Sequence, residues 1–265
     1  MRTLVMLTLM LLLTVTVATA ASPDATAIVQ QMETALEPAR PSTQKWTIVV
    51  TDKQGESTQL VAYQARKRVR NENWLLTVLQ APKSLEGIAY LVQEREDQPG
   101  LQWIYLPAVR RVRELMPSGE QQDFLGTDFT YGDLGFLNLH DRTYTFLGMK
   151  QHQGVWAYEV QEIPHQSWYY SRIVTWVAAD SSLPLQRAYY DRANRLWRIE
   201  RFEEIKRIDG VPTPLWISME DRQAGSSSTI AVSEVRYDAD VPDSLFDPDR
   251  LAEAAASPVW QATGS

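Results

Sequence analysis

The chain has 265 residues, a formal net charge of −7 and no cysteine. Because no disulfide can form, burial of apolar side chains must hold the fold together. The acidic balance argues against a general nucleic-acid-binding protein. Beyond the N-terminus, no segment is apolar enough to span a bilayer.

The first 20 residues are typical of a secretory signal peptide. Arg2 supplies a positive charge, an apolar run follows from Leu4 to Val17, and Ala18-Thr19-Ala20 offers the small residues that signal peptidase recognises. The run is shorter than the ~20 residues of a membrane-spanning helix. We therefore expect export to the periplasm, cleavage after Ala20, and a single soluble domain over residues 21–265 that does not span the membrane.

One amphipathic helix is expected from Asp24 to Glu37, with Ser22 or Asp24 as its N-cap. The two-residue alternation that follows is typical of strands. Strands are expected near residues 46–51, 59–66, 74–80, 88–93, 101–106 and 110–115.

The alternation stops between Pro117 and Asn138, in a stretch rich in glycine, aromatic and acidic residues. A connection of this length is usually functional or folded into short helices, and we expect one or two here, capped by Thr127 or Thr130. Strands are expected again at 143–150, 155–163, 170–178, 185–190, 196–205, 216–221 and 229–237. Short strands with turn sequences between them predict one mainly β domain, an antiparallel barrel or sandwich.

Some predicted strands are apolar on both faces. Leu75, Leu76, Val78 and Leu79 are an example. Such a strand is covered on each side. The covers are either a helix and a cavity, or the two halves of a filled core, and the sequence leaves both open.

Patterns for catalysis and metal binding are missing from the sequence. The three histidines, His140, His152 and His165, form no metal-ligand motif, and no nucleophile, phosphate or dinucleotide motif is present. We expect no metal, no cofactor and no enzyme activity. Asp123, Asp128 and Asp133 keep a carboxylate-dependent hydrolase open as a weaker alternative, although acids in such a loop often serve as caps and turn residues.

Two basic groups stand out against the acidic total: Arg66, Lys67, Arg68 and Arg70 in one, and Arg110, Arg111 and Arg113 in the other. They are either charged strand edges that oppose aggregation or a rim that meets anionic head groups or an acidic partner. The chain also has nine tryptophans, mostly inside predicted strands. This set favours a core or an apolar cavity with polar exits.

A central block resembles the signature of the outer membrane lipoprotein-sorting proteins, the LolA-like periplasmic proteins often found beside RND-type exporters. The block comprises Trp103-Ile104-Tyr105-Leu106-Pro107-Ala108, Arg110-Arg111-Val112-Arg113 and Phe124 to Leu134, with Pro107, Arg111, Gly126, Thr127, Asp128 and Asp133 as its motif residues. The ending Val241 to Phe246 is also similar to this family. Gly132 departs from the pattern, since members commonly carry an acid there, and we expect a looser lid.

This resemblance implies a curved, half-open antiparallel β-barrel with covering helices (LolA/LppX-like). Its apolar concave face would shelter the acyl chains of lipoproteins, or of free lipids, during transfer toward the outer membrane, with an RND-type transporter as partner. A periplasmic sensor of the same fold is the alternative. The helix at 24–37 and the segment 124–139 would act as lids. The expected cavity lining is Trp46, Ile48, Trp74, Leu76, Trp103, Tyr105, Phe129, Tyr131, Trp156 and Trp176.

Overall fold

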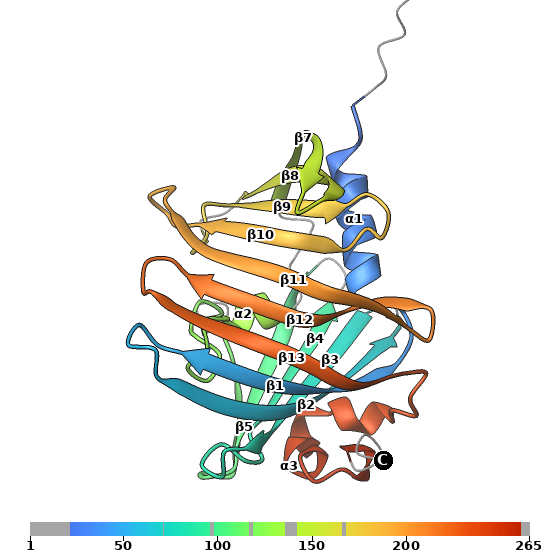
Figure 1. Cartoon of the computed structure of the whole chain (residues 1–265). Coiled ribbons are helices and arrows are strands. Elements are labelled where there is room, and N and C mark those ends of the chain that lie inside the picture. Colours follow the sequence, from blue (N-terminus) through green and yellow to red (C-terminus); the bar gives the residue numbers. More distant parts are fainter. Residues whose placement is uncertain are drawn as a thin grey trace, which may run out of the picture.

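The computed structural model describes residues 22–70, 72–95, 98–116, 119–135, 142–165 and 168–260. The expected signal peptide lies outside these residues. Within them, thirteen strands form one antiparallel sheet in the order β6-β5-β4-β3-β2-β1-β13-β12-β11-β10-β9-β8-β7 (Figure 1). The sheet therefore ends at two edge strands, β6 and β7, and is not closed into a barrel.

The first half of the sheet comprises β1 (Ser42–Thr51), β2 (Ser57–Val69), β3 (Glu72–Ala81), β4 (Ala89–Arg95), β5 (Gln98–Leu106) and β6 (Arg111–Glu114). The second half comprises β7 (Arg142–His152), β8 (Val155–Pro164), β9 (Arg172–Ala178), β10 (Pro184–Tyr190), β11 (Leu196–Ile208), β12 (Val211–Asp221) and β13 (Ser226–Tyr237). The helices are α1 (Ala25–Leu36), α2 (Tyr131–Leu134), η3 (Asp243–Phe246), η4 (Pro248–Arg250) and α3 (Leu251–Ala254). Within the described residues, no helix has the length and apolar character needed to cross a membrane.

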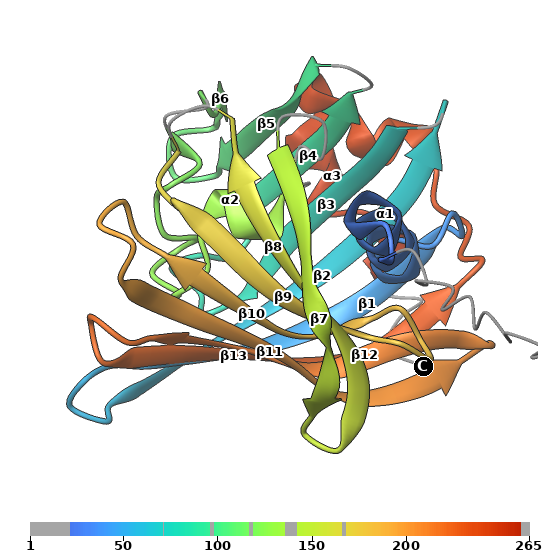
Figure 2. The same ribbon diagram turned by 90° about the horizontal axis from the view of Figure 1, so that it is seen from above.

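The sheet curves so that α1 and α2 both lie on its concave side (Figure 2). Of the two predicted N-caps, Ser22 and Asp24, it is Asp24 that caps α1, because its side chain accepts a hydrogen bond from the backbone N–H of Thr26 at 2.9 Å. Ile28 and Met32 of α1 pack against Val160 and Val177 of the sheet. The first turn is thus capped by a side chain, and the apolar face of the helix is buried.

Both faces of β3 are buried, as its sequence predicts, but by different covers. Leu75 and Leu79 belong to the core on the concave side. Leu76 and Val78 belong to a second core, which the C-terminal segment builds with residues such as Phe246. This C-terminal cover, η3 to α3 and the residues up to Trp260, was not expected from the sequence.

Strand β12 is longer than predicted and begins at Val211 although Pro212 and Pro214 lie in its first half. A proline cannot donate a backbone hydrogen bond, so it is tolerated where one side of the strand has no neighbour. Residues 211–214 pair with β11, whereas pairing with β13 starts at Trp216. The prolines therefore lie where β12 has a partner on one side.

Candidate ligand-binding site

The segment from residue 119 to 135, called here the plug segment, fills the middle of the concave side. Its helix α2 begins with a capping box: Thr130 Oγ1 accepts from the N–H of Asp133 at 3.0 Å, and Asp133 Oδ2 accepts from the N–H of Thr130 at 2.8 Å. The prediction of a short helix is confirmed, and of its two candidate caps, Thr127 and Thr130, it is Thr130 that caps it. Residues 136–139 of the expected second lid lie outside the described residues.

Aromatic side chains attach the plug segment to the sheet. Phe124, Phe129 and Tyr131 are buried in the concave core. The ring centroid of Tyr131 lies 5.1 Å from that of Tyr90, whose hydroxyl donates to the carbonyl oxygen of Tyr131 at 2.9 Å. Much of the concave face is therefore occupied by the protein itself.

A serine pair on β13 holds the plug segment through Asp128. The two carboxylate oxygens of Asp128 accept hydrogen bonds from Ser226 Oγ at 2.5 Å and Ser228 Oγ at 2.6 Å. Ser228 Oγ also accepts from the Asp128 N–H at 2.9 Å. These bonds satisfy a carboxylate that would otherwise be costly to bury.

Arg198 of β11 is a second polar anchor of the plug segment. Its Nη2 lies 3.0 Å from Asp123 and its Nε lies 3.2 Å from Asp221, with Asp133 3.7 Å from Nη1. Burial raises the pKa of Asp133, and hydrogen bonds from Thr130 and the charge of Arg198 oppose that rise. The three acids of the hydrolase alternative are thus engaged in contacts that hold the plug segment to the sheet.

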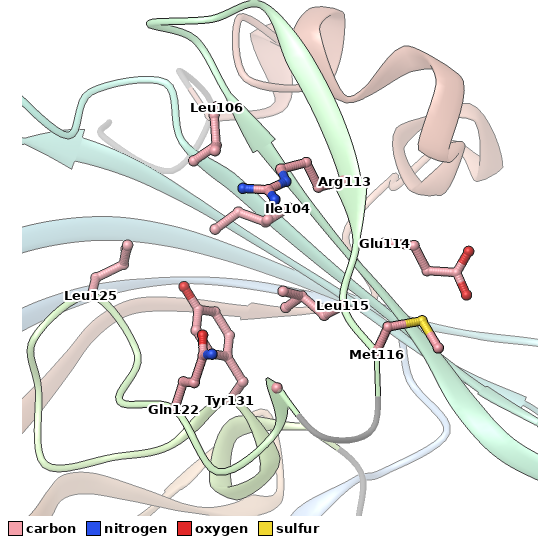
Figure 3. A pocket seen from close by; sticks show the side chains of 10 residues that line it. Ile104, Leu106, Arg113, Glu114, Leu115, Met116, Gln122, Leu125 and Tyr131 are labelled. Carbon is pink, nitrogen blue, oxygen red and sulfur yellow. The ribbon is translucent and has the colours of Figure 1, made fainter.

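A pocket of about 460 Å³ opens between the β5–β6 edge and the plug segment (Figure 3). Its apolar lining is Ile104, Leu106, Leu115, Met116 and Leu125, and Arg113, Glu114, Gly119, Gln122 and Tyr131 complete it. This volume lies within the ~300–1,000 Å³ of small-molecule sites. A mostly apolar wall with a few polar groups suits an amphiphilic ligand.

Helix α1 meets the concave face through carboxylates as well as apolar residues. Glu33 lies 3.5 Å from Arg187 of β10, which also lies 3.5 Å from Glu200 of β11. Burial is the main cause that raises the pKa of Glu200 to about 7.

At its C-terminal end, α1 is followed by Glu37, which accepts from Asn73 Nδ2 at 3.1 Å and lies 3.8 Å from Arg66. Burial raises the pKa of Glu37 to about 8, and the charge of Arg66 opposes the rise. The contact of this helix with the sheet is therefore partly polar. Arg66, from the first basic group, takes part in it.

The ten residues expected to line a cavity lie in separate places. Trp46, Ile48, Phe129 and Tyr131 belong to the concave core, and Tyr131 also lines the pocket. Leu76, Trp74, Trp103 and Tyr105 pack in the core beneath the C-terminal cover, on the opposite face of the sheet. Trp156 is 55% exposed, and Trp176 stacks on His152 with ring centroids 5.1 Å apart.

Sequence reasoning did not single out most of the pocket's apolar lining. Ile104 and Leu106 alternate with Trp103 and Tyr105 along β5 and therefore lie on the opposite face of the strand. The alternation does not show which of the two faces lines the pocket. Leu115 lies just beyond the end of β6, although the predicted strand 110–115 included it, and Leu125 lies in irregular backbone, where alternation gives no signal.

The motif residues mainly shape the backbone around the pocket. Gly126 has a φ of +82°, which favours glycine, and Thr127 Oγ1 donates to the carbonyl of Phe129 at 3.2 Å. Pro107 lies in the turn between β5 and β6, close to Gly87, and Arg111 is exposed on β6. Within the described ranges, no group of three or more His, Asp or Glu side chains could hold a metal ion.

Solved structures with the same architecture define the class of fold. A putative outer membrane lipoprotein-sorting protein domain from Vibrio parahaemolyticus is 22% identical, with a TM-score of 0.81 over 86% of this chain and 98% of that one. A DUF1329 family protein from Desulfovibrio piger is 25% identical, with a TM-score of 0.80 over 86% and 97%. A LolA superfamily protein from Nitrosomonas europaea is 21% identical, with a TM-score of 0.69 over 86% and 99%.

The chain thus has the curved, open, mainly β fold of the LolA-like proteins, which confirms the resemblance and the fold class expected from the sequence. A family model described as "Uncharacterized protein" matches residues 71–253, and the chain belongs to that family. No curated protein matches the chain at a significant level.

Proposed function

We propose that this protein is a periplasmic carrier that shelters the acyl chains of lipids or lipoproteins during transfer toward the outer membrane. The pocket between the β5–β6 edge and the plug segment is the observation that carries this proposal, because five apolar side chains line it. Each methylene group removed from water is worth about 0.8 kcal/mol. A hydrocarbon chain of modest length therefore gains enough by entering such a pocket to stay bound in an aqueous compartment.

The open edge of the sheet suits a ligand that must be loaded and released. The pocket borders β6, the edge strand, and is not enclosed behind continuous sheet. In this proposal the plug segment acts as the lid of the pocket, whereas α1, which the sequence analysis expected to be a second lid, covers the part of the concave side formed by β7 to β9. The ten lining residues expected from the sequence would then contribute to the shape of the domain, with Tyr131 touching the cargo.

Export and partnership are parts of the same proposal. The expected signal peptide, residues 1–20, would direct a single domain, residues 21–265, to the periplasm. An RND-type transporter would supply or receive the cargo. The Vibrio parahaemolyticus neighbour, described as a putative outer membrane lipoprotein-sorting protein domain, supports this assignment of class.

Mass spectrometry of the purified protein, exported by its own expected signal peptide, tests the proposal. Organic extraction should release acyl-containing molecules bound to it. A Leu106→Gln/Leu115→Gln variant polarises the pocket wall and should lose most of them. The matched control Leu147→Gln/Met149→Gln changes two exposed apolar residues that do not line the pocket and should retain them.

Urea denaturation of both variants separates a lost site from a lost fold. Absence of bound acyl species, together with no binding of added fatty acid or fatty alcohol by the wild-type protein, would contradict the carrier proposal.

A further inference from the structure

We infer that the cargo is an amphiphile with an anionic head, a carboxylate or a phosphate, and that Arg111 and Arg113 hold this head at the mouth of the pocket. The inference rests on the proposed carrier function and adds the chemical class of the ligand. It depends on the placement of the two arginines on β6 relative to the apolar wall.

Strand pairing puts both arginines on the face of the sheet that forms the pocket. Arg113 pairs with Ile104 and Arg111 pairs with Leu106, and residues directly opposite in an antiparallel pair share a face. Ile104 and Leu106 both line the pocket. Arg113 itself lines the pocket, and Arg111 lies two residues away on the same face of β6.

The side chains that line the pocket show which charge faces it. In Figure 3, Arg113 extends over Ile104 into the pocket, whereas the carboxylate of Glu114 points away from it. Neighbouring residues in a strand point to opposite faces, so this sorting of charge follows from the backbone of β6. Of these two charged side chains, the positive one therefore faces the pocket.

These arginines differ from the buried arginines of the same face. Arg187 and Arg198 are each held by two or more carboxylates of the protein. Within the part of the chain that the structure describes, Arg111 and Arg113 have no ion pair, although the protein has a net charge of −7. A guanidinium group offers two parallel N–H donors that match a carboxylate or a phosphate.

Charged residues on an edge strand can also serve to prevent aggregation. That role needs charge along the edge but not a particular sign on the pocket face. The positive charge of Arg111 and Arg113, and their position on the pocket face of β6, favour a contact with a ligand. A lipid with its chain along Ile104 and Leu115 would place its head beside them.

Two ligands with the same chain and different heads test this inference. Dodecanoate and dodecanol should both bind the full-length wild-type protein in a calorimetric titration. Dodecanoate should bind roughly three- to tenfold more tightly at low salt, the size expected for partly exposed charge pairs. The preference should shrink as salt is added.

Paired substitutions test whether Arg111 and Arg113 cause the preference for dodecanoate. Arg111→Gln/Arg113→Gln should bring the affinity ratio close to one without weakening dodecanol. Lys53→Gln/Lys206→Gln removes the same charge from two exposed side chains outside the pocket lining and should keep the preference. Inorganic phosphate alone should bind at least about tenfold more weakly than dodecanoate, because it lacks the chain.

Three results would overturn the inference: equal affinity of the wild-type protein for the two ligands, a preference that survives Arg111→Gln/Arg113→Gln, or phosphate binding as tight as that of dodecanoate. Failure of both dodecyl ligands to bind would instead count against the carrier function itself. Binding of both ligands with equal affinity would be consistent with the carrier function and would contradict only the preference for an anionic head group.

Discussion

The hydroxyl oxygen of Tyr169 lies 2.3 Å from the point where a β-carbon on residue 132 would be, and Gly132 is the residue that leaves this space free. The same hydroxyl lies 3.1 Å from Thr130 Oγ1, the side chain that caps α2. The sequence suggested a looser lid at Gly132. In the structure Gly132 is buried, and Tyr169, which precedes β9, packs against it, so this contact joins the plug segment to the chain leading into β9.

Gly132→Ala should lower the free energy of unfolding by about 1–3 kcal/mol, because the added methyl group would overlap the Tyr169 hydroxyl. The next nearest atoms, of Glu120, lie 3.4 Å away, so the hydroxyl is the main obstacle. In a Tyr169→Phe background the same substitution should cost at least about 1 kcal/mol less. Urea denaturation of the four proteins measures this difference. Equal costs in the two backgrounds would show that the contact does not constrain the plug segment.

Arg198→Met should be among the most destabilising single substitutions on the concave face. Arg198 is 4% exposed, and its loss would leave the buried acids Asp133 and Asp221 without their cation. Breaking a buried ion pair in this way costs about 3–5 kcal/mol.

The matched control for this prediction is Arg201→Met, three residues further along β11. Arg201 is more exposed and pairs with Glu220 at 3.3 Å. Its loss should cost less than about 1 kcal/mol. Denaturant titration compares the two, and similar losses would argue against Arg198 as an anchor of the plug segment.

The free energy of unfolding should fall as the pH rises from about 5 to 8. Burial raises the pKa of Glu37 to about 8 and that of Glu200 to about 7, from an ordinary value of 4.5. Between these values the folded protein holds more protons than the unfolded chain, so higher pH favours unfolding. The slope can reach about 1.4 kcal/mol per pH unit for each such group. A backbone hydrogen bond from Arg195 lowers the pKa of Asp191 to about 2. Asp191 therefore affects the pH dependence of the free energy of unfolding only at more acidic pH.

Glu37→Gln should flatten this dependence, because it removes one of the two groups. Glu56→Gln, in an exposed turn, should leave it unchanged. Urea denaturation at several pH values measures the slopes. A stability that stays level or rises between pH 5 and 8 in the wild-type protein would contradict the assignment of neutral carboxyl groups beneath α1.

Local signals in the sequence predicted the parts of the fold that depend on neighbouring residues. Asp24 and Thr130 were each one of two candidate caps, beside Ser22 and Thr127, since a cap is recognised from the few residues that follow it. The strands were found by their alternation, with boundaries shifted by a few residues. The curvature of the sheet came from the resemblance and not from the alternation.

The location of the pocket could not be derived in the same way. Alternation shows that Trp103 and Tyr105 share one face of β5 and that Ile104 and Leu106 share the other, but it does not show which face is concave. That depends on contacts far apart in sequence, such as those that bring the C-terminal cover onto Trp103. The large aromatic residues drew attention to the face that this cover buries.

Photolabelling with a dodecanoate that carries a diazirine near the end of its chain tests the central claim most directly. After irradiation and digestion, the label should be found on peptides that contain Ile104 and Leu106 or Leu115 and Leu125, and excess dodecanoate should suppress it. Labelling that is absent, or that falls on the exposed Trp156 and resists competition, would contradict the claim that this pocket holds an acyl chain.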